Sequence, residues 1–325
     1  MLTKNNTPVI GKQLDKVAQT IEEHLVVRNK DIERATTELQ RAGGKMLRPS
    51  FLLIFAALGD TSKQSEEQLI SLAASVEVLH MATLIHDDIV DDSPMRRGIQ
   101  TVQSKYGKDI AVYTGDLLFT VYFELLASSG DLGDFIKVNS KAMKKILLGE
   151  LDQMHTRFNQ EITMLDYFRS ISGKTAELFS LACREGAHFG YCPPNVEKLA
   201  TRIGTNIGLA FQVLDDILDY SATRKDLKKP VLEDISEGVY TSPLILGMQK
   251  NREAFCPFLD KKEPLTVEES DNLRKLVIES GGLDAAKELA QRLTQKALDD
   301  IDHLPKGKAQ KLLLKLTKEL LKRTY

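Results

Sequence analysis

Apolar residues recur every three or four positions along almost the whole chain. Leu72, Val76 and Leu79 show this spacing near the start, and Ile203 and Ile207 show it again in the second half. Positions three and four apart fall on one face of an α-helix, whereas a half-buried strand alternates with a period of two. We find no convincing run of two-residue alternation. The sequence therefore predicts an all-α protein.

Turn-forming residues mark the ends of the predicted helices, because glycine and proline interrupt helical hydrogen bonding. They stand at Gly43-Gly44, Ser93-Pro94, Ser129-Gly130, Cys192-Pro193-Pro194, residues 224–243 and Leu304-Pro305. No low-complexity linker divides the chain, and several helices are apolar on more than one face, as the central helices of a bundle are. We therefore expect one helical domain that spans residues 1–325.

Composition and charge exclude several classes of protein. With 44 Lys and Arg against 46 Asp and Glu, the net charge of -2 gives no overall field for nucleic acid. The 3 cysteines predict neither a disulfide framework nor a zinc site. The first residues do not resemble a signal peptide, and the longest clearly apolar run, residues 51–58, is too short to cross a bilayer. We expect a cytoplasmic protein.

Two apolar stretches contain similar aspartate clusters, DDIVD at residues 87–91 and DDILD at residues 215–219. In a helix, the first and last carboxylates of each cluster lie on one face. A carboxylate pair of this kind on a polar helix would indicate a solvated surface. Here the surrounding residues are apolar, and like charges within one turn repel. A cation is therefore expected at both clusters.

Carboxylate ligands without cysteine favour magnesium over zinc. Magnesium takes one or two carboxylates and completes its shell with water and substrate phosphates. Two facing clusters therefore predict Mg²⁺ ions that bridge to a diphosphate. We interpret His86, beside Asp87, as a packing or supporting residue rather than a ligand.

Basic residues near the first cluster match an anionic substrate. Lys45 and Arg48 lie in GGKMLRP, which has the form of a helix end, a loop and a new helix start, where free amides favour anions. Arg96 and Arg97 follow the first cluster after one loop, and guanidinium groups bind phosphate in a bidentate manner. Each pair alone would also fit a solvated loop.

Three further residues are candidates for the same site. His80 precedes Asp87 by about two helical turns and therefore points to the same side, although a lone histidine on an apolar helix is more often a core residue. Lys174 and Thr175 provide a cation and a hydroxyl in SGKTAELF. That segment is not a P-loop, because the required glycine spacing and preceding strand are missing.

Together these residues closely resemble the trans-isoprenyl diphosphate synthase family. GGKMLRP, the ExxH of Glu77 to His80, DDIVD, RRG, KT and GLAFQVLDDILD occur in the family's order, from near the start to Pro243. The resemblance implies a single-domain, isoprenoid-synthase-type helical bundle with a central active-site cavity. It also implies a prenyltransferase that adds isopentenyl diphosphate to an allylic diphosphate such as farnesyl diphosphate.

Carried over by position, the resemblance assigns a role to each candidate. The implied Mg²⁺ ligands, which bridge the allylic diphosphate, are Asp87, Asp88, Asp91, Asp215, Asp216 and Asp219. The implied contacts to the allylic phosphates are Arg96, Lys174 and Lys229, and those to isopentenyl diphosphate are Lys45, Arg48, His80 and Arg97. Thr175 and Gln212 would line the reaction centre.

The implied mechanism is ionisation, condensation and elimination. Cations stabilise the departing diphosphate, the double bond of isopentenyl diphosphate attacks the allylic cation, and a proton then leaves. Two positions depart from the family: Met46 replaces a usual basic residue, and Val239 stands where many members carry lysine. Neither position is assigned a role in phosphate binding.

Product length is expected to depend on the residues one turn before Asp87. Ala82 and Thr83 are both small, whereas bulky aromatics there stop growth early in the family, so we expect hexaprenyl or heptaprenyl diphosphate. Such products provide the side chains of respiratory quinones. The floor of the tunnel is expected deeper, with Phe119, Tyr122 and Phe123 as candidates. A shorter, geranylgeranyl product is the alternative.

The resemblance is strongest to the large subunit (component II) of bacterial two-component hexaprenyl or heptaprenyl diphosphate synthases. A small regulatory subunit is therefore an expected partner, with a homodimer as the alternative. The C-terminal residues 306–325 carry lysines among leucines. They could contact a membrane surface during product release, although a packing helix with a solvated basic face is the favoured interpretation.

Proteins of other classes fit the sequence less well. A metal-dependent phosphohydrolase would use the dipeptide His86-Asp87, but the 6 histidines offer no further ligands near the second cluster. A terpene cyclase would not need the basic residues implied to bind isopentenyl diphosphate. A non-catalytic helical subunit would have no reason to keep both repelling aspartate clusters.

Overall fold

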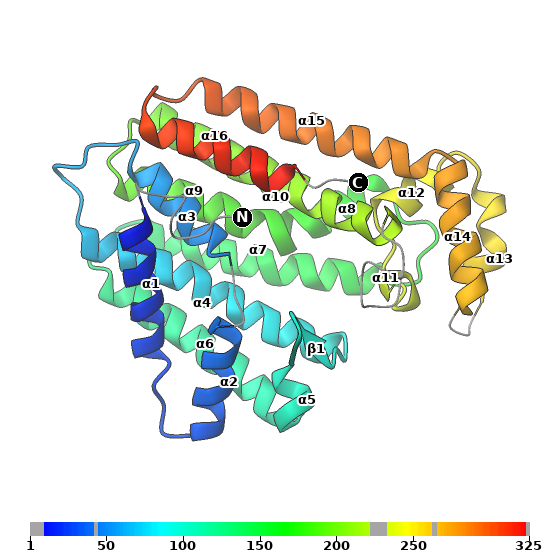
Figure 1. The fold of residues 1–325 in the computed structure, drawn as a ribbon, viewed down its shortest axis with the longest axis horizontal. Coiled ribbons are helices and arrows are strands. Elements are labelled where there is room, and N and C mark those ends of the chain that lie inside the picture. Colours follow the sequence, from blue (N-terminus) through cyan, green and yellow to red (C-terminus); the bar gives the residue numbers. More distant parts are fainter. Residues whose placement is uncertain (1–9, 42–44, 222–232, 262–264, 323–325) are drawn as a thin grey trace. The chain divides into compact units, whose positions relative to one another are not determined.

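The computed structural model describes residues 10–41, 45–221, 233–261 and 265–322. These residues form helices almost throughout, which confirms the all-α prediction (Figure 1). Two compact units are distinguished, each composed of separate segments of the chain. Of the described residues, those within 1–138, 181–201 and 304–313 form unit 1, and those within 139–180, 202–303 and 314–325 form unit 2.

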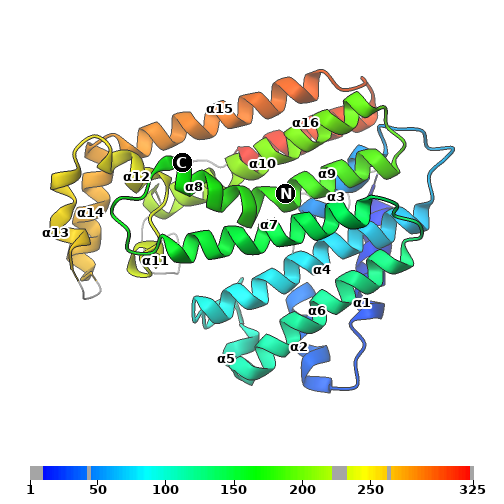
Figure 2. The same ribbon diagram turned by 180° about the vertical axis from the view of Figure 1, so that it is seen from behind.

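Unit 1 is organised around one long helix. Its elements are α1 (Gly11–His24), α2 (Lys30–Arg41), α3 (Leu47–Ala56), α4 (Glu66–Val90), β1 (Met95–Arg96), β2 (Ile99–Gln100), α5 (Val102–Tyr106) and α6 (Lys108–Ser128). Helix α4 begins at the cap Ser65, whose side chain accepts a hydrogen bond from the Gln68 amide. Helices α1, α3 and α6 pack on it, and both views show α4 and α6 side by side (Figures 1 and 2).

Unit 2 contains the remaining short elements and one long helix. They are α8 (Met164–Ile171), the π-helix η2 (Ser172–Ala176), α11 (Glu233–Ser236), α12 (Ser242–Met248), the 3-10 helix η3 (Arg252–Ala254), α13 (Cys256–Leu259), α14 (Val267–Glu279) and α15 (Gly282–Asp302). Helix α12 packs on α15, α14 and α8. Four helices have residues in both units: α7 (Phe135–His155), α9 (Glu177–Phe189), α10 (Pro194–Ser221) and α16 (Lys308–Leu321).

Most predicted helix ends are confirmed. Helix α4 ends before Ser93, α6 ends before Ser129, α10 begins at Pro194, and α15 ends before Leu304. Gly43 and Gly44 lie outside the described residues. Helix α3 begins two residues before Pro49, so that the proline lies in the first turn of the helix. Its missing amide hydrogen is tolerated there.

The β1–β2 hairpin was not predicted. Its strands contain two residues each, with Met95 opposite Gln100 and Arg96 opposite Ile99, which is too short for a visible alternation of apolar residues. The two-residue loop is Arg97-Gly98, and both residues have positive φ, 51° and 82°. This combination defines a type I′ turn, which matches the twist of a tight hairpin.

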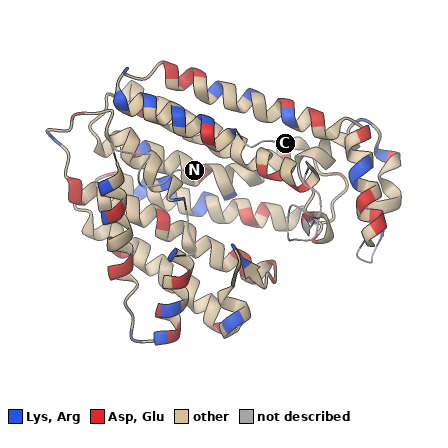
Figure 3. Ribbon diagram, viewed as in Figure 1, with Lys and Arg blue, Asp and Glu red and all other residues tan. Residues whose placement is uncertain are grey.

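Charge is distributed as expected for a bundle with a buried centre. Residues of both signs occur along α15, the charged residues of α16 are lysines apart from Glu319, and much of α4 is uncharged (Figure 3). Helix α16 buries Leu313, Leu316 and Leu320 and exposes Lys311 and Lys315. The C-terminal leucines are thus packed in the protein, and the lysines form a solvated face.

Among the described residues, two helices are long and apolar enough, by length and composition alone, to cross a membrane: α4 and α6. Neither is an uninterrupted apolar run in the sequence, because each contains isolated polar residues. In the apolar part of α4, 72% of the residues are buried inside the protein. Its apolar surface is therefore covered by neighbouring helices.

Glycines allow α9 to approach α3 closely within unit 1. A Cβ added at Gly186 would lie 2.1 Å from the backbone oxygen of Leu52, and one at Gly190 would lie 2.5 Å from the Ala56 Cα. Backbone atoms cannot move aside as a flexible side chain can. These two glycines therefore set the distance between the helices.

We expect Gly186→Ala to lower the free energy of unfolding by about 3 kcal/mol, because the added methyl group overpacks a backbone contact. Urea denaturation followed by circular dichroism would measure the change. Gly307→Ala is the matched control, since nothing lies within 4 Å of a Cβ at that position. Equal stability of the two variants would contradict the proposed close contact.

Candidate active site

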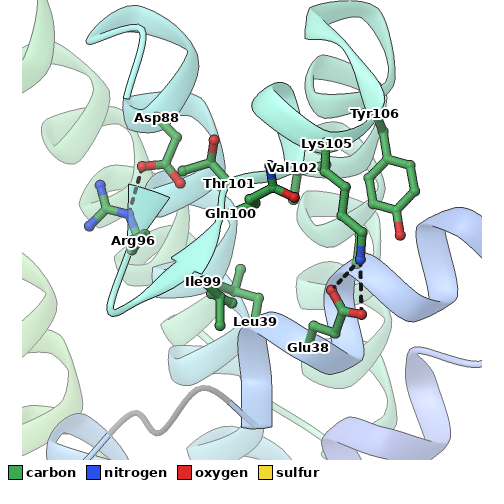
Figure 4. Close-up of a pocket in the computed structure, with 11 residues that line it drawn as sticks. Glu38, Leu39, Asp88, Arg96, Ile99, Gln100, Thr101, Val102, Lys105 and Tyr106 are labelled. Atoms are coloured by element: carbon green, nitrogen blue, oxygen red, sulfur yellow. Dashed lines mark hydrogen bonds and ion pairs between the residues drawn. The ribbon is translucent and has the colours of Figure 1, made fainter. Parts of the chain in front are cut away.

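The first aspartate cluster forms the C-terminal turn of α4. Asp87 and Asp91 are half-buried, whereas Asp88 is only 3% exposed. The carboxylate of Asp88 points to the hairpin, where its Oδ1 accepts a hydrogen bond of 2.7 Å from Nε of Arg96 (Figure 4). The three carboxylates therefore have different environments, although they are close in sequence.

The hairpin positions the two arginines of RRG. Its base is fixed to the end of α4, because the Thr101 hydroxyl donates to the Ser93 carbonyl at 2.7 Å and the Ser93 amide donates to the Asp88 carbonyl at 3.0 Å. Arg96 is in strand β1, whereas Arg97 is at the tip and exposed. Arg96 and Arg97 are neighbours in sequence, but they occupy different positions in the hairpin.

Asp88 and Arg96 line a pocket to which α5 contributes Lys105. Its ammonium group contacts both carboxylate oxygens of Glu38 on α2, at 2.8 and 3.0 Å (Figure 4). This ion pair connects α2, which precedes GGKMLRP, with the helix that follows the hairpin. Both side chains are partly exposed, so the pair contributes little to stability but links the two segments.

The predicted residues for isopentenyl diphosphate surround a buried glutamate. A pocket is lined by Met46, Glu77, His80, Arg97 and four further residues, Leu39, Gln40, Met81 and Leu84. The charges of Arg48 and Arg97 both act on the carboxylate of Glu77. Lys45 lies at the exposed end of the preceding loop. The structure therefore brings Arg48, His80 and Arg97 together and adds Glu77, which the sequence analysis had named only as part of ExxH.

Burial shifts the pKa values of the ionisable groups in this cluster. Burial raises the pKa of Glu77, although Arg48 and Arg97 oppose the shift, and burial lowers the pKa of Arg48 to about 10. For His80, burial and then the charges of Arg48, Arg97 and Arg96 hold the pKa well below its usual value. His80 is therefore a neutral hydrogen-bonding group at pH 7, while the arginines carry the positive charge.

His86 packs against α6, as its interpretation as a packing residue predicted. Its ring is stacked on Phe119, with centroids 5.3 Å apart, and its Nε2 lies 3.4 Å from Oδ1 of Asp116. Gly115 makes room for the ring, since a Cβ there would lie 2.4 Å from Nε2. The histidine thus holds α6 close to the aspartate-bearing turn.

The candidate floor residues on α6 have different environments. Phe119 is engaged with His86, Phe123 is 44% exposed, and Tyr122 is completely buried. Of the two small residues before Asp87, Ala82 is completely buried and Thr83 is half-buried, with its hydroxyl donating to the His80 carbonyl at 2.9 Å. Thr83 lies four residues before Asp87 and shares its helix face.

The second aspartate cluster, in unit 2, has a buried centre. Asp215 is exposed, Asp219 is half-buried and Asp216 is 3% exposed. The oxygen Oδ1 of Asp216 accepts from Nε2 of Gln212 at 3.0 Å. Its other oxygen accepts from the hydroxyl groups of Tyr167, at 2.5 Å, and Ser242, at 3.2 Å.

Burial and mutual repulsion raise the pKa values of these carboxyl groups. The pKa of Asp216 is raised to about 7, chiefly by burial, against the hydrogen bonds from Tyr167 and Gln212. The pKa of Asp219 is raised to about 8 by burial and by the charge of Asp234, to which it is hydrogen-bonded. A positive ion beside such carboxylates would stabilise their charged forms.

The segment SGKTA forms the π-helix η2. The ammonium group of Lys174 contacts Oε2 of Glu150 at 2.8 Å and Oε1 of Gln153 at 2.9 Å. The next hydroxyl, that of Thr175, donates to Oε1 of Gln212 at 2.7 Å. π-Helical turns are rare and frequently occur at functional sites. Here the turn joins Lys174 and Thr175 to the second aspartate cluster through Gln212.

The donor chemistry of both clusters fits magnesium. Within the described residues, no three His, Cys, Asp or Glu side chains converge as a complete set of metal ligands. Magnesium does not require such a set, because it binds one or two carboxylates and takes phosphate and water oxygens as well. Asp87, Asp91, Asp215 and Asp219 offer hard oxygen ligands of this kind.

Some residues of the site were not predicted or are not described. Tyr167, Ser242 and Glu150 carried no signal in the sequence, because their roles depend on contacts between distant segments. Asp234 is hydrogen-bonded to Asp219. Lys229 lies outside the described residues. Val239 follows α11, and its amide donates to the Asp234 carbonyl at 2.8 Å.

These elements define an all-α isoprenoid-synthase fold with two aspartate clusters and a basic pocket. The chain belongs to the polyprenyl synthetase family, whose profile matches residues 29–276. It is therefore a prenyltransferase, as the sequence predicted.

Similar proteins include enzymes with different products. Heptaprenyl diphosphate synthase component 2 of Bacillus subtilis (strain 168) is 29% identical over 90% of this chain and 83% of its own. A geranylgeranyl pyrophosphate synthase from Lactobacillus brevis ATCC 367 has a crystal structure with a TM-score of 0.94 and 41% identity, covering 98% of both chains. A polyprenyl synthase from Caulobacter crescentus CB15, crystallised with calcium and isoprenyl diphosphate, has a TM-score of 0.87 and 31% identity over 98% of this chain and 96% of its own.

We expect Arg96→Ala to lower the free energy of unfolding by about 2–4 kcal/mol, because it leaves the buried Asp88 carboxylate without its ion-pair partner. The same change in an Asp88→Asn background should cost much less, which a double-mutant cycle by urea denaturation would measure. Lys105→Ala is the control for an exposed pair in the same pocket and should have a much smaller effect. Equal costs in both backgrounds would contradict the coupling.

Proposed function

We propose that this prenyltransferase is an all-trans, medium-chain polyprenyl diphosphate synthase. It would add isopentenyl diphosphate units to an allylic diphosphate such as farnesyl diphosphate and form hexaprenyl or heptaprenyl diphosphate for quinone side chains. The observation that carries the proposal is the presence of two aspartate clusters in the C-terminal turns of α4 and α10, each after a largely apolar stretch, one accompanied by arginines and the other by Lys174.

Mg²⁺ is the proposed cofactor, and it would neutralise the charge of the departing diphosphate. We assign different tasks to the six predicted aspartates. Asp87, Asp91, Asp215 and Asp219 are the proposed ligands. Asp88 and Asp216 have protein donors on their carboxylates and are proposed to hold the clusters in shape. The Caulobacter polyprenyl synthase complexed with calcium and isoprenyl diphosphate supports the proposal that this chain binds a divalent ion and a diphosphate.

The remaining residues are proposed to bind and orient the two substrates. Arg96, Lys174 and Lys229 would contact the allylic diphosphate, and Lys45, Arg48, His80 and Arg97 would contact isopentenyl diphosphate. Glu150 and Gln153 hold the Lys174 ammonium group in place before the substrate arrives. Thr175 and Gln212, joined by a hydrogen bond, present dipoles to the reaction centre. Preorganised groups of this kind stabilise charge without the cost of reorientation.

The chain itself provides no strong general base in this scheme. The allylic C–O bond breaks and its electron pair leaves with the diphosphate; the double bond of isopentenyl diphosphate then forms the new C–C bond. The proton released in the final elimination goes to the departed diphosphate. The neutral His80 and the charged arginines bind the unreacted diphosphate throughout.

Product length has two candidates. Hexaprenyl or heptaprenyl diphosphate is supported by the small residues Ala82 and Thr83 and by the heptaprenyl synthase component of B. subtilis. Geranylgeranyl diphosphate is the second candidate, supported by the 41% identity to the L. brevis enzyme.

A partner chain is also proposed, most simply a small subunit like that implied by the name component 2, with a homodimer as the alternative. Exposed apolar side chains on α7 support a partner: Leu147, Leu148, Leu151 and Met154 are each at least 44% exposed and lie on one side of the helix. We further propose that the two units work as one catalytic domain in the cytoplasm, with only transient membrane contact during product release.

The proposal is tested by incubating the purified chain with Mg²⁺, farnesyl diphosphate and labelled isopentenyl diphosphate, and sizing the products. We expect products that end at six or seven prenyl units. When EDTA removes the Mg²⁺, no labelled isopentenyl diphosphate should be incorporated. Products that end at four units would favour the geranylgeranyl alternative.

No incorporation by the chain alone would indicate a missing small subunit, which is then added. If the reconstituted pair also incorporates no labelled isopentenyl diphosphate, under conditions in which a known synthase is active, the proposed reaction is overturned. Arg292→Gln is a matched surface control, because Arg292 lies on α15 away from both clusters in sequence and has no role in the scheme.

We expect Thr83→Phe to shorten the final product, because the aromatic ring would project from the same face of α4 as Asp87, one turn away. Thin-layer or mass-spectrometric sizing of the products measures the change. Ala82→Phe should also shorten the product, but it overpacks a completely buried position and is expected to lower stability as well. An unchanged product from both variants, with each one folded, would exclude these positions as determinants of length.

A further inference from the structure

The hydroxyl group of Tyr167 donates a short hydrogen bond to the second aspartate cluster. Tyr167 is on α8 and is only 4% exposed, and its hydroxyl lies 2.5 Å from Oδ2 of Asp216 on α10. Nothing in the proposed reaction requires a phenol at this place. A buried hydroxyl directed at a buried carboxylate therefore calls for a separate explanation.

Asp216 is surrounded by protein donors. Its Oδ1 accepts from the Gln212 amide at 3.0 Å, and its Oδ2 accepts from Tyr167 at 2.5 Å, from the Ser242 hydroxyl at 3.2 Å and from the Ser242 backbone amide at 3.4 Å. A carboxylate has about four lone-pair sites. Its acceptor capacity is thus used within the protein.

These contacts join four elements of unit 2. Tyr167 belongs to α8, Gln212 and Asp216 to α10, Ser242 to the start of α12, and Thr175 to η2. The Gln212 amide donates to Asp216 and accepts from Thr175, so its orientation is fixed by both partners. The orientation of Gln212 therefore depends on the position of the Asp216 carboxylate.

We propose that Tyr167 is a positioning residue for the metal and diphosphate site: together with Ser242 it fixes the carboxylate of Asp216, and thereby the turn of α10 that presents Asp215 and Gln212. This inference rests on the proposed function. Tyr167 does not touch substrate or metal in this role. It acts through Asp216, as outer residues that orient metal-binding carboxylates do.

The test is Tyr167→Phe, which removes the hydroxyl and keeps the ring. Outer residues of this kind typically affect metal affinity or activity by about 10- to 100-fold. We expect the Mg²⁺ concentration for half-maximal activity to rise by about 10-fold and kcat to fall by a similar factor. The KM for isopentenyl diphosphate should stay unchanged, because its proposed residues belong to unit 1.

A binding measurement separates this role from the reaction itself. Mn²⁺ binding in the presence of inorganic pyrophosphate, followed by electron paramagnetic resonance, should weaken by about 10-fold in Tyr167→Phe. Tyr240→Phe is the matched control: Tyr240 is a buried tyrosine of the same unit, 4% exposed, and its hydroxyl is not a donor to Asp216. It should bind Mn²⁺ as the unmodified chain does.

A double mutant tests whether Tyr167 acts through Asp216. Tyr167→Phe combined with Asp216→Asn should bind Mn²⁺ no more weakly than Asp216→Asn alone. Additive losses would overturn the proposal, as would unchanged Mn²⁺ binding by a folded Tyr167→Phe variant. If Tyr167→Phe does not fold, Ser242→Ala replaces it, with a smaller loss in the same direction expected and normal binding overturning the proposal.

The outcomes also separate this inference from the proposed function. If the unmodified chain makes no polyprenyl product, even with a partner subunit, the proposed reaction fails, but Mn²⁺ binding with pyrophosphate still tests Tyr167. If the chain makes product and the variant matches it in both Mg²⁺ dependence and Mn²⁺ binding, only the role of Tyr167 is overturned.

Discussion

The dominant physical constraint on this chain is the placement of carboxylates in helices that are otherwise apolar. Removing a charged carboxylate from water is unfavourable unless donors or cations replace the lost hydration. Asp88 obtains this from Arg96, and Asp216 obtains it from Tyr167, Gln212 and Ser242. The compensation is incomplete, because the pKa values of both groups remain raised. The hairpin carries Arg96, α8 carries Tyr167 and the start of α12 carries Ser242. Each of these elements therefore lies where it can donate a hydrogen bond to a buried carboxylate.

Helix α4 combines two properties that usually exclude each other. It is buried along most of its length, yet Glu77, His80, Thr83 and Asp87 form a polar strip along it at spacings of three and four residues. The strip begins among arginines and ends at the aspartate cluster. Because His80 is neutral, positive charge in this region is provided by guanidinium groups, which stay protonated even when burial lowers their pKa. The helix can thus provide an apolar wall and a charged site at once.

The fold class could be predicted from the sequence, and so could the helix face on which a residue lies when that face follows from helical spacing. The aspartates, His80 and the helix ends at Ser93, Ser129 and Pro194 were predicted because they depend on local rules of turn and periodicity. The hairpin was missed because two-residue strands carry no period, although Arg97-Gly98 is a reasonable type I′ turn in retrospect. Tyr167 and Ser242 were missed for a different reason. They lie 49 and 26 residues from Asp216, and only tertiary packing brings them to it.

The π-helical turn at Ser172–Ala176 has a consequence for how this segment can vary. Hydrogen bonds from residue i to i+5 accommodate one more residue than an α-helical turn does. Loss of a single residue there would restore regular α-helical bonding and leave α9 in nearly the same orientation, because the five residues of a π-turn and the four of an α-turn both complete about one turn. Lys174 and Thr175 are both within the wide turn, where they contact Glu150 and Gln212. A deletion in this segment would therefore spare the course of the helix and change the groups that it directs to its neighbours.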